Sequence, residues 1–85
     1  MEDATPVDDL ARLVTYVASN LVSEPSTVEV TGEQRATSVH LTLHVPQAEL
    51  GKVIGREGRI ARAMRTVVMI AGMRHNVRAS LDIDG

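Results

Sequence analysis

The chain has 85 residues, which leaves room for one domain at the usual size of roughly 100 to 200 residues. Hydrophobic residues make up 44% and cysteine is absent, which excludes a disordered tail, a transmembrane protein, a disulfide scaffold and a thiol nucleophile. The net charge of -2 conceals an asymmetry: acids dominate up to Leu50, and seven bases face three acids from Gly51 onward, so a polyanion is expected to meet the second half.

The first predicted element is a helix that begins after Thr5. Thr5 suits the N-cap, Pro6 the first helical position and Asp8 a capping-box contact. Apolar residues then recur with the spacing of one buried helix face, namely Leu10, Leu13, Val14, Val17, Ala18 and Leu21. Glu24 is expected to end the helix, because the residue before a proline is disfavoured in helices.

Two strands are predicted next, over 27–31 and 38–45, because polar and apolar residues alternate there. Gly32-Glu33-Gln34 lies between them and is expected to form the loop of an antiparallel hairpin. Pro46 is expected to end the second strand and to begin a short helix that reaches Leu50.

After residue 58 the helical period returns. One face of this second long helix is apolar and the opposite one basic, with Arg59, Arg62 and Arg65. Its apolar residues are Ile60, Met64, Val67, Val68 and Ala71. Gly72 and Asn76 are candidate ends of the helix, and a third strand follows over 77–84. The sequence therefore predicts an α+β domain with a three-stranded sheet packed on helices, ordered over about residues 6–84 with residues 1–5 flexible.

Gly55 and Gly58 bracket a two-residue loop between the short helix and the long basic one. Two glycines three positions apart allow a sharp turn and the close approach of another backbone. The helix that starts at the loop presents free N–H groups and the positive end of its dipole, and Lys52, Arg56 and Arg59 add positive charge. The segment is therefore predicted to bind phosphate groups.

The spacing of the glycines narrows the kind of phosphate ligand. A mononucleotide-binding P-loop needs four residues between its glycines and then Gly-Lys-Ser/Thr, a string that does not occur here. A dinucleotide-binding loop needs a further glycine where Val53 stands, and it follows a buried strand rather than a short helix. Both nucleotide classes are therefore disfavoured.

The residues around the loop resemble the signature of the KH domain, an apolar pair followed by GxxG and a further apolar residue, here Val53-Ile54-Gly55-Arg56-Glu57-Gly58-Arg59-Ile60. The element order is similar to the type II, prokaryotic arrangement. The longer string from Gly51 to Val68 resembles the small bacterial single-KH proteins of the KhpA type, and the resemblance extends over nearly the whole chain.

The resemblance implies a cytoplasmic, non-catalytic protein that binds single-stranded RNA, because KH domains clamp about four nucleotides with this loop. It implies an RNA chaperone or post-transcriptional regulator that forms a homodimer or pairs with a KH protein of the Jag (KhpB) type. No cofactor, metal ion or membrane is expected. The residues assigned to RNA binding are Lys52, Val53, Ile54, Gly55, Arg56, Glu57, Gly58, Arg59, Ile60 and Arg62.

Some of these residues have other interpretations. Glu57 places a carboxylate beside the expected phosphates, so we expect it to weaken binding without abolishing it. Arg62 and Arg65 fit a solvated helix face as well as they fit RNA contact. His40 and His44 lie four residues apart on one strand face, about 13 Å at ~3.3 Å per residue, which is too far to share a zinc ion.

Two further hypotheses stand beside RNA binding. One is a protein interaction module whose partner makes the RNA contact; exposed Met69 and Met73 would suit it, although methionine more commonly fills a core. The other is membrane-surface binding through the basic helix. An enzyme is least expected, because no arrangement of nucleophile, base and orienting group can be assembled from the sequence.

Overall fold

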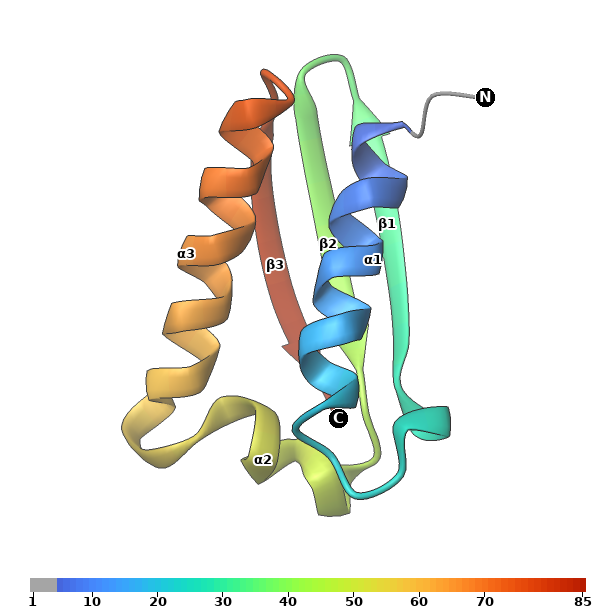
Figure 1. The fold of residues 1–85 in the computed structure, drawn as a ribbon, viewed down its shortest axis with the longest axis vertical. Helices are drawn as coiled ribbons and strands as arrows, with labels where there is room; N and C mark the ends of the chain where they lie inside the picture. Colours follow the sequence, from blue (N-terminus) through green and yellow to red (C-terminus); the bar gives the residue numbers. More distant parts are fainter. Residues whose placement is uncertain (1–4) are drawn as a thin grey trace.

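The computed structural model describes residues 5–85, and most of the end expected to be flexible lies outside them. Two long helices, α1 (Pro6–Ser19) and α3 (Arg59–Arg74), pack on one face of a three-stranded sheet (Figure 1). The strand order is β1 (Glu29–Arg35), β2 (Ser38–His44), β3 (Arg78–Asp84). The opposite face of the sheet carries polar side chains and is open to solvent. The predicted α+β class and element order are confirmed.

Helix α1 spans Pro6–Ser19 and begins as predicted. The Asp8 N–H donates to the Thr5 hydroxyl at 3.2 Å, and Pro6 occupies the first turn. The predicted apolar face is buried at Leu10, Val14 and Ala18.

The predicted end of this helix at Glu24 is wrong. Asn20 closes the helix instead, and its side-chain amide donates to the Tyr16 carbonyl at 2.7 Å. The next two N–H groups, of Leu21 and Val22, both turn back to the carbonyl of Ala18. The chain then reaches Pro25 through an irregular connection.

Strands β1 (Glu29–Arg35) and β2 (Ser38–His44) form the predicted antiparallel hairpin, but its loop is shorter and later than expected. Residues 32–34 belong to β1, and only residues 36 and 37 make the turn. Gly32 pairs with Leu41, and a Cβ added to it would lie 2.6 Å from Val7 Cγ2. This glycine therefore admits α1 close to the sheet and does not mark a turn.

Strand β3 (Arg78–Asp84) pairs with β2 in parallel, so the chain crosses over between them. The crossover contains η2 (Gln47–Glu49), α2 (Leu50–Ile54), η3 (Arg56–Gly58) and α3 (Arg59–Arg74). The short helix expected from Pro46 to Leu50 is a 3-10 turn over η2, and α2 begins at Leu50, where that helix was expected to stop. The α2–α3 loop lies at the end of the molecule opposite the β1–β2 turn (Figure 1).

The core is aliphatic and lies between the sheet and the two long helices. Its fully buried side chains are Leu10, Val14, Val39, Leu41, Leu43, Val53 and Val68. The buried face of α3 is rotated from the predicted one. Ala61 and Gly72 are buried, whereas Val67, which was expected on that face, is exposed. Gly72 is not a helix end: a Cβ there would lie 2.7 Å from the Ala79 Cβ, so it allows α3 to approach β3. Asn76, at φ 60°, follows the helix end as predicted.

Candidate nucleic-acid interface

The predicted loop joins α2 to α3 and is built on three left-handed residues. Gly55 has φ 77°, Glu57 has φ 57° and Gly58 has φ 75°. Gly55 caps the end of α2, and its N–H donates to the carbonyl of Gly51 within that helix. The Gly58 N–H donates to the Gly55 carbonyl. These bonds fold residues 56–58 into one tight turn immediately before α3.

Gly55 is required by both conformation and space. Its ψ of 174° at positive φ belongs to a region that only glycine adopts readily. A Cβ on this residue would lie 2.6 Å from Ile60 Cγ1, because Ile60 folds back over the loop from α3. The loop and the first turn of α3 are therefore one packed unit.

The positive charges around the loop differ in their engagement. Arg56 is exposed and forms no ion pair with any residue in the described range 5–85. Arg59 lies 3.5 Å from the Glu57 carboxylate, and the Arg62 guanidinium donates to the Glu57 carbonyl at 2.8 Å. Glu57 thus engages two of the predicted RNA-binding arginines.

The amino end of α3 is available to an anion. Within residues 5–85, no side chain makes a capping hydrogen bond there. The first N–H groups of a helix have no partner inside it, and they carry the positive end of the dipole. The Gly58 N–H donates to the Gly55 carbonyl and the Arg59 N–H to the Arg56 carbonyl. The turn therefore presents the positive end of the α3 dipole next to Arg56.

Lys52 lies on α2 and faces a different environment. Its ammonium is 3.0 Å from the carboxylate of Glu49 and also donates to the Ser23 hydroxyl. The Glu49 carboxylate additionally accepts the Ser23 N–H at 3.2 Å. The hydrogen bond from Lys52 holds the pKa of the Glu49 carboxyl below its ordinary value near 4.5, and it outweighs the opposing effect of burial. Neither Ser23 nor Glu49 was among the site residues predicted from sequence.

The apolar residues of the signature lie around the same turn. Val53 is fully buried, whereas Ile54 and Ile60 are partly exposed. The ten predicted residues are thus brought together in one continuous segment from α2 to the second turn of α3. They differ in exposure, since Val53 lies in the core and Arg56 on the surface.

Arg65 is exposed, as expected for a solvated helix face, and it makes one further contact. Its Nε donates to the main-chain carbonyl of Leu81 at 3.0 Å. Leu81 lies on β3, an edge strand, so this carbonyl would otherwise face solvent. Arg65 therefore joins α3 to the sheet. A bond between positions 16 residues apart leaves no pattern in the sequence.

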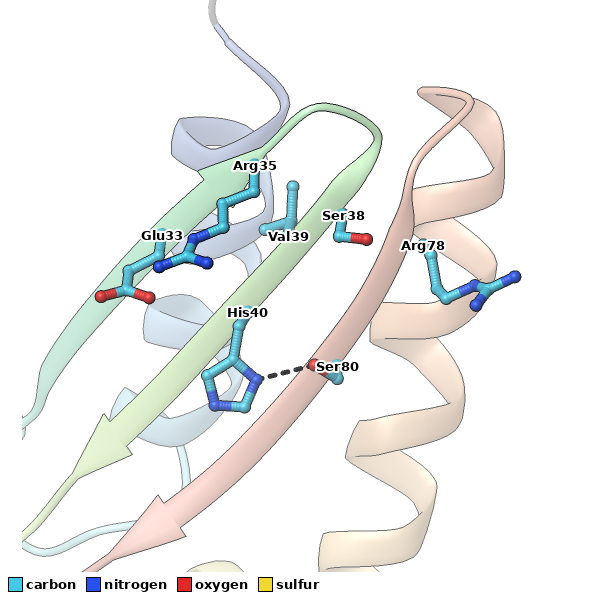
Figure 2. Close-up of a pocket in the computed structure, with 7 residues that line it drawn as sticks. All are labelled: Glu33, Arg35, Ser38, Val39, His40, Arg78 and Ser80. Atoms are coloured by element: carbon cyan, nitrogen blue, oxygen red, sulfur yellow. Dashed lines mark hydrogen bonds between the residues drawn. The ribbon is translucent and has the colours of Figure 1, made fainter.

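The open face of the sheet corrects the expectation that no nucleophile, base and orienting group can be assembled. His40 Nδ1 lies 2.7 Å from Ser80 Oγ (Figure 2). The Nε2 atom of His40 lies 3.2 Å from the carboxylate of Asp82. Parallel register brings these residues together from β2 and β3. The array stands on a water-exposed surface, however, where electrostatic stabilisation of a transition state is weak. It is a cross-strand polar network.

A shallow hollow of about 180 Å³ lies beside this network. Two arginines line it, but the guanidinium of Arg35 lies toward the Glu33 carboxylate and that of Arg78 points away toward α3 (Figure 2). The two cations do not converge, so the hollow is not an anion site.

The second half of α3 carries an exposed apolar surface. Large hydrophobic side chains are exposed there at Val67, Met69, Ile70 and Met73. A hollow of about 290 Å³ between α1 and α3 continues this surface and is lined by Val17, Leu21, Ile60 and Ala63 among others. Of the two alternatives left open for Met69 and Met73, exposure and core filling, the structure shows exposure. Over residues 5–85, no helix has the length and apolar character to cross a bilayer.

Comparison with known proteins identifies relatives over most of the chain. The family model for the KH domain of KhpA/KhpB matches residues 11–83. The RNA-binding protein KhpA of Clostridium acetobutylicum is 43% identical over 77 residues, covering 87% of this chain and 99% of that protein. The KhpA of Halalkalibacterium halodurans is 41% identical over 74 residues, covering 87% and 97%, and that of Chlamydia pneumoniae is 35% identical, covering 87% and 95%.

Similarity to a solved structure supports the fold. A crystal structure of Era from Aquifex aeolicus matches with a TM-score of 0.70 at 14% identity, over 95% of this chain and 31% of that one. The chain thus spans about a third of Era, and the likeness concerns the fold alone. The curated relatives, by contrast, are matched over nearly their whole length, and each is named an RNA-binding protein. The chain therefore belongs to the KhpA/KhpB family of KH domains.

Proposed function

We propose that this protein binds single-stranded RNA in the cytoplasm without catalysis, and that the loop from Gly55 to Gly58 clamps the RNA backbone. The observation that carries the proposal is the loop itself, a left-handed turn beside the uncapped amino end of α3 with Arg56 exposed on it. Such an end favours phosphate through its N–H groups and its dipole. The names of the relatives support RNA as the ligand.

Each part of the segment has a distinct task in this proposal. Arg56 and the positive amino end of α3 hold phosphate oxygens. Arg59 and Arg62 add contacts when RNA displaces Glu57 from them. Ile54 and Ile60 offer partly exposed apolar surface to bases, and Val53 supports them from the core. Because the chain has no Phe or Trp, aliphatic contacts and hydrogen bonds take the place of aromatic stacking.

The proposal is tested with short single-stranded RNA by fluorescence anisotropy. Three or four phosphate contacts correspond to a slope of roughly -2 to -3 in a plot of log affinity against log salt concentration, at about -0.7 per contact. Arg56→Asp should weaken binding about tenfold or more, because it removes a charge-assisted bond and adds repulsion. Arg12→Asp on the exposed side of α1 makes the same charge change outside the loop and should have little effect. Equal binding by both variants would contradict the proposal.

The exposed surface of α3 supports a second role, as a protein interaction module. Four large apolar side chains, those of Val67, Met69, Ile70 and Met73, face solvent on one helix. Contiguous apolar surface of this kind marks interaction sites. In this second proposal the chain pairs with a second copy or with a KhpB-type KH protein, and linking two RNA sites raises avidity without new contacts. Such an assembly would suit an RNA chaperone or a post-transcriptional regulator.

Light scattering and RNA titration together separate the two roles. If the isolated chain binds RNA through the loop, the module has its own RNA site whatever its oligomeric state. If it dimerises but binds RNA no better than Arg56→Asp does, RNA contact lies with the partner and the interaction role is the better account.

A further inference from the structure

A lysine that binds phosphate needs an ammonium group without a competing anion, whereas the ammonium of Lys52 contacts the Glu49 carboxylate. In the part of the chain that the structure describes, Glu49 is the one charged side chain that is buried, with 9% of its residue surface exposed. Its carboxylate accepts the Ser23 N–H at 3.2 Å and the Lys52 ammonium at 3.0 Å. The Lys52 ammonium also donates to the Ser23 hydroxyl. Three residues from two distant segments thus form a closed network.

This network lies directly behind the RNA-binding loop. Glu49 immediately precedes α2, Lys52 lies within α2, and Gly55 ends it. Helix α2 has five residues, far fewer than the ~12 to 15 that a helix needs to be stable alone. Its orientation therefore depends on tertiary contacts, namely the burial of Val53 and the bonds to Ser23 in the connection after α1.

The charge of Lys52 is already compensated. Opposite unit charges at this distance attract each other strongly where one partner is shielded from water, and the Glu49 side chain is only 11% exposed. A phosphate that approaches Lys52 meets an ion pair with no net charge. If Lys52 bound the phosphate instead of Glu49, the buried Glu49 carboxylate would lose its ion-pair partner, which is strongly unfavourable. Arg56 has no such partner among the described residues.

We propose that Lys52, Glu49 and Ser23 position the loop for RNA, and that Lys52 acts through Glu49 without neutralising a phosphate itself. This inference rests on the proposed RNA-binding function and revises the role that the sequence pattern assigned to Lys52. Glu49 and Ser23 become determinants of RNA affinity although neither touches RNA.

The two possible roles of Lys52 predict opposite effects of Glu49→Gln. If Lys52 contacts phosphate, removing the opposing carboxylate frees its charge, and RNA affinity should rise. If the network positions the loop, the same change loosens α2, and RNA affinity should fall severalfold. Lys52→Met should then cause a similar fall, and the double variant should be little worse than either single one, because the residues act as one unit.

The salt dependence provides the matched control. Lys52→Met and Arg56→Met remove the same charge while keeping an unbranched side chain. We expect Arg56→Met to flatten the salt slope by about 0.7, the value of one contact with single-stranded RNA, and Lys52→Met to leave the slope unchanged. If both substitutions lowered RNA affinity only by disturbing the structure, the salt slopes of the two variants would be the same.

The outcomes are decisive in each case. Higher affinity of Glu49→Gln, a slope flattened by Lys52→Met, or unchanged affinity in both variants would overturn the positioning role. If circular dichroism shows that a variant fails to fold, Ser23→Ala removes only the hydroxyl and should lower affinity with an unchanged slope; unchanged affinity of this variant then counts against the proposal. If Arg56→Met changes neither affinity nor slope, the proposed function itself fails, whatever the Lys52 result.

Discussion

The guanidinium of Arg62 donates to the main-chain carbonyl of Glu57, and this bond ties α3 to the one non-glycine residue of the loop that has a positive φ. Glu57 also holds Arg59 at 3.5 Å through its carboxylate. One residue in the loop thus occupies two cations with two different groups. The residue whose charge we expect to oppose RNA also organises the surface proposed to meet it.

Replacing Glu57 by asparagine separates these two effects. Asparagine tolerates a left-handed backbone and keeps the carbonyl that accepts from Arg62, but it has no charge. We expect Glu57→Asn to raise RNA affinity severalfold and to steepen the salt slope by about 0.7, because Arg59 becomes available for one more contact. Anisotropy titrations at several salt concentrations measure both quantities. A weaker affinity would show that the carboxylate itself supports binding.

Two glycines four positions apart should respond to alanine in opposite ways. Gly55→Ala meets Ile60 at 2.6 Å and occupies a backbone region closed to alanine, so we expect a loss of about 2 to 4 kcal/mol in the free energy of unfolding. Gly51→Ala lies in α2, where an added Cβ has no neighbour within 4 Å in the described structure, and should stabilise by up to about 1 kcal/mol. Urea denaturation measures both changes, and equal effects would contradict the loop geometry.

The Glu49 network predicts how stability changes in acid. The pKa of Glu49 is lowered in the folded state, chiefly by Lys52, so its ionised form stabilises the fold above its ordinary pKa near 4.5. This contribution is lost as the pH falls through the folded pKa. We expect the difference in unfolding free energy between wild type and Glu49→Gln to be largest near neutral pH and to shrink below about pH 4.5. A difference in unfolding free energy that does not change with pH would show that ionisation of Glu49 does not stabilise the fold.

A charge in the centre of the exposed α3 surface should prevent self-association. Ile70 is 53% exposed, so Ile70→Glu should leave the fold intact while it disfavours burial of this surface against a partner. Light scattering is expected to show a dimer for wild type and a monomer for the variant. Ala48→Glu introduces the same charge at an exposed position of η2 and should stay dimeric. If wild type and Ile70→Glu are both monomers or both dimers, the exposed surface of α3 is not a dimer interface.

The sequence predicts the fold where one local rule decides the structure. Thr5 and Pro6 mark the start of α1 because capping chemistry is local, and the alternation in β2 and β3 follows from a single buried face. The prediction that Gly32 lies in a turn is wrong, because the role of this glycine depends on the approach of Val7 from another element. The end of α1 was misplaced for a similar reason, since Leu21 and Val22 leave the helix but still pack against the core.

The candidate site divides in the same way. Its glycines and arginines are contiguous, so the pattern reveals them. The engagement of Lys52 by Glu49 and Ser23, and of Arg65 by Leu81, joins positions up to 29 residues apart. Such pairings depend on how the elements dock, and no spacing rule in one sequence contains them.

The crossover between β2 and β3 has a consequence for when the site can form. The paired residues Ser38 and Arg78 are separated by 40 positions, and contacts so distant in the chain form slowly because a long loop must first close. Helix α3 docks on β3, which is made after the loop during synthesis. A nascent chain that ends before β3 already contains α3 and its contacts with α1 and α2, but it lacks the strand that holds α3 on the sheet. We therefore expect competence for RNA to be a late event of co-translational folding, and a chain truncated after Arg74 not to bind.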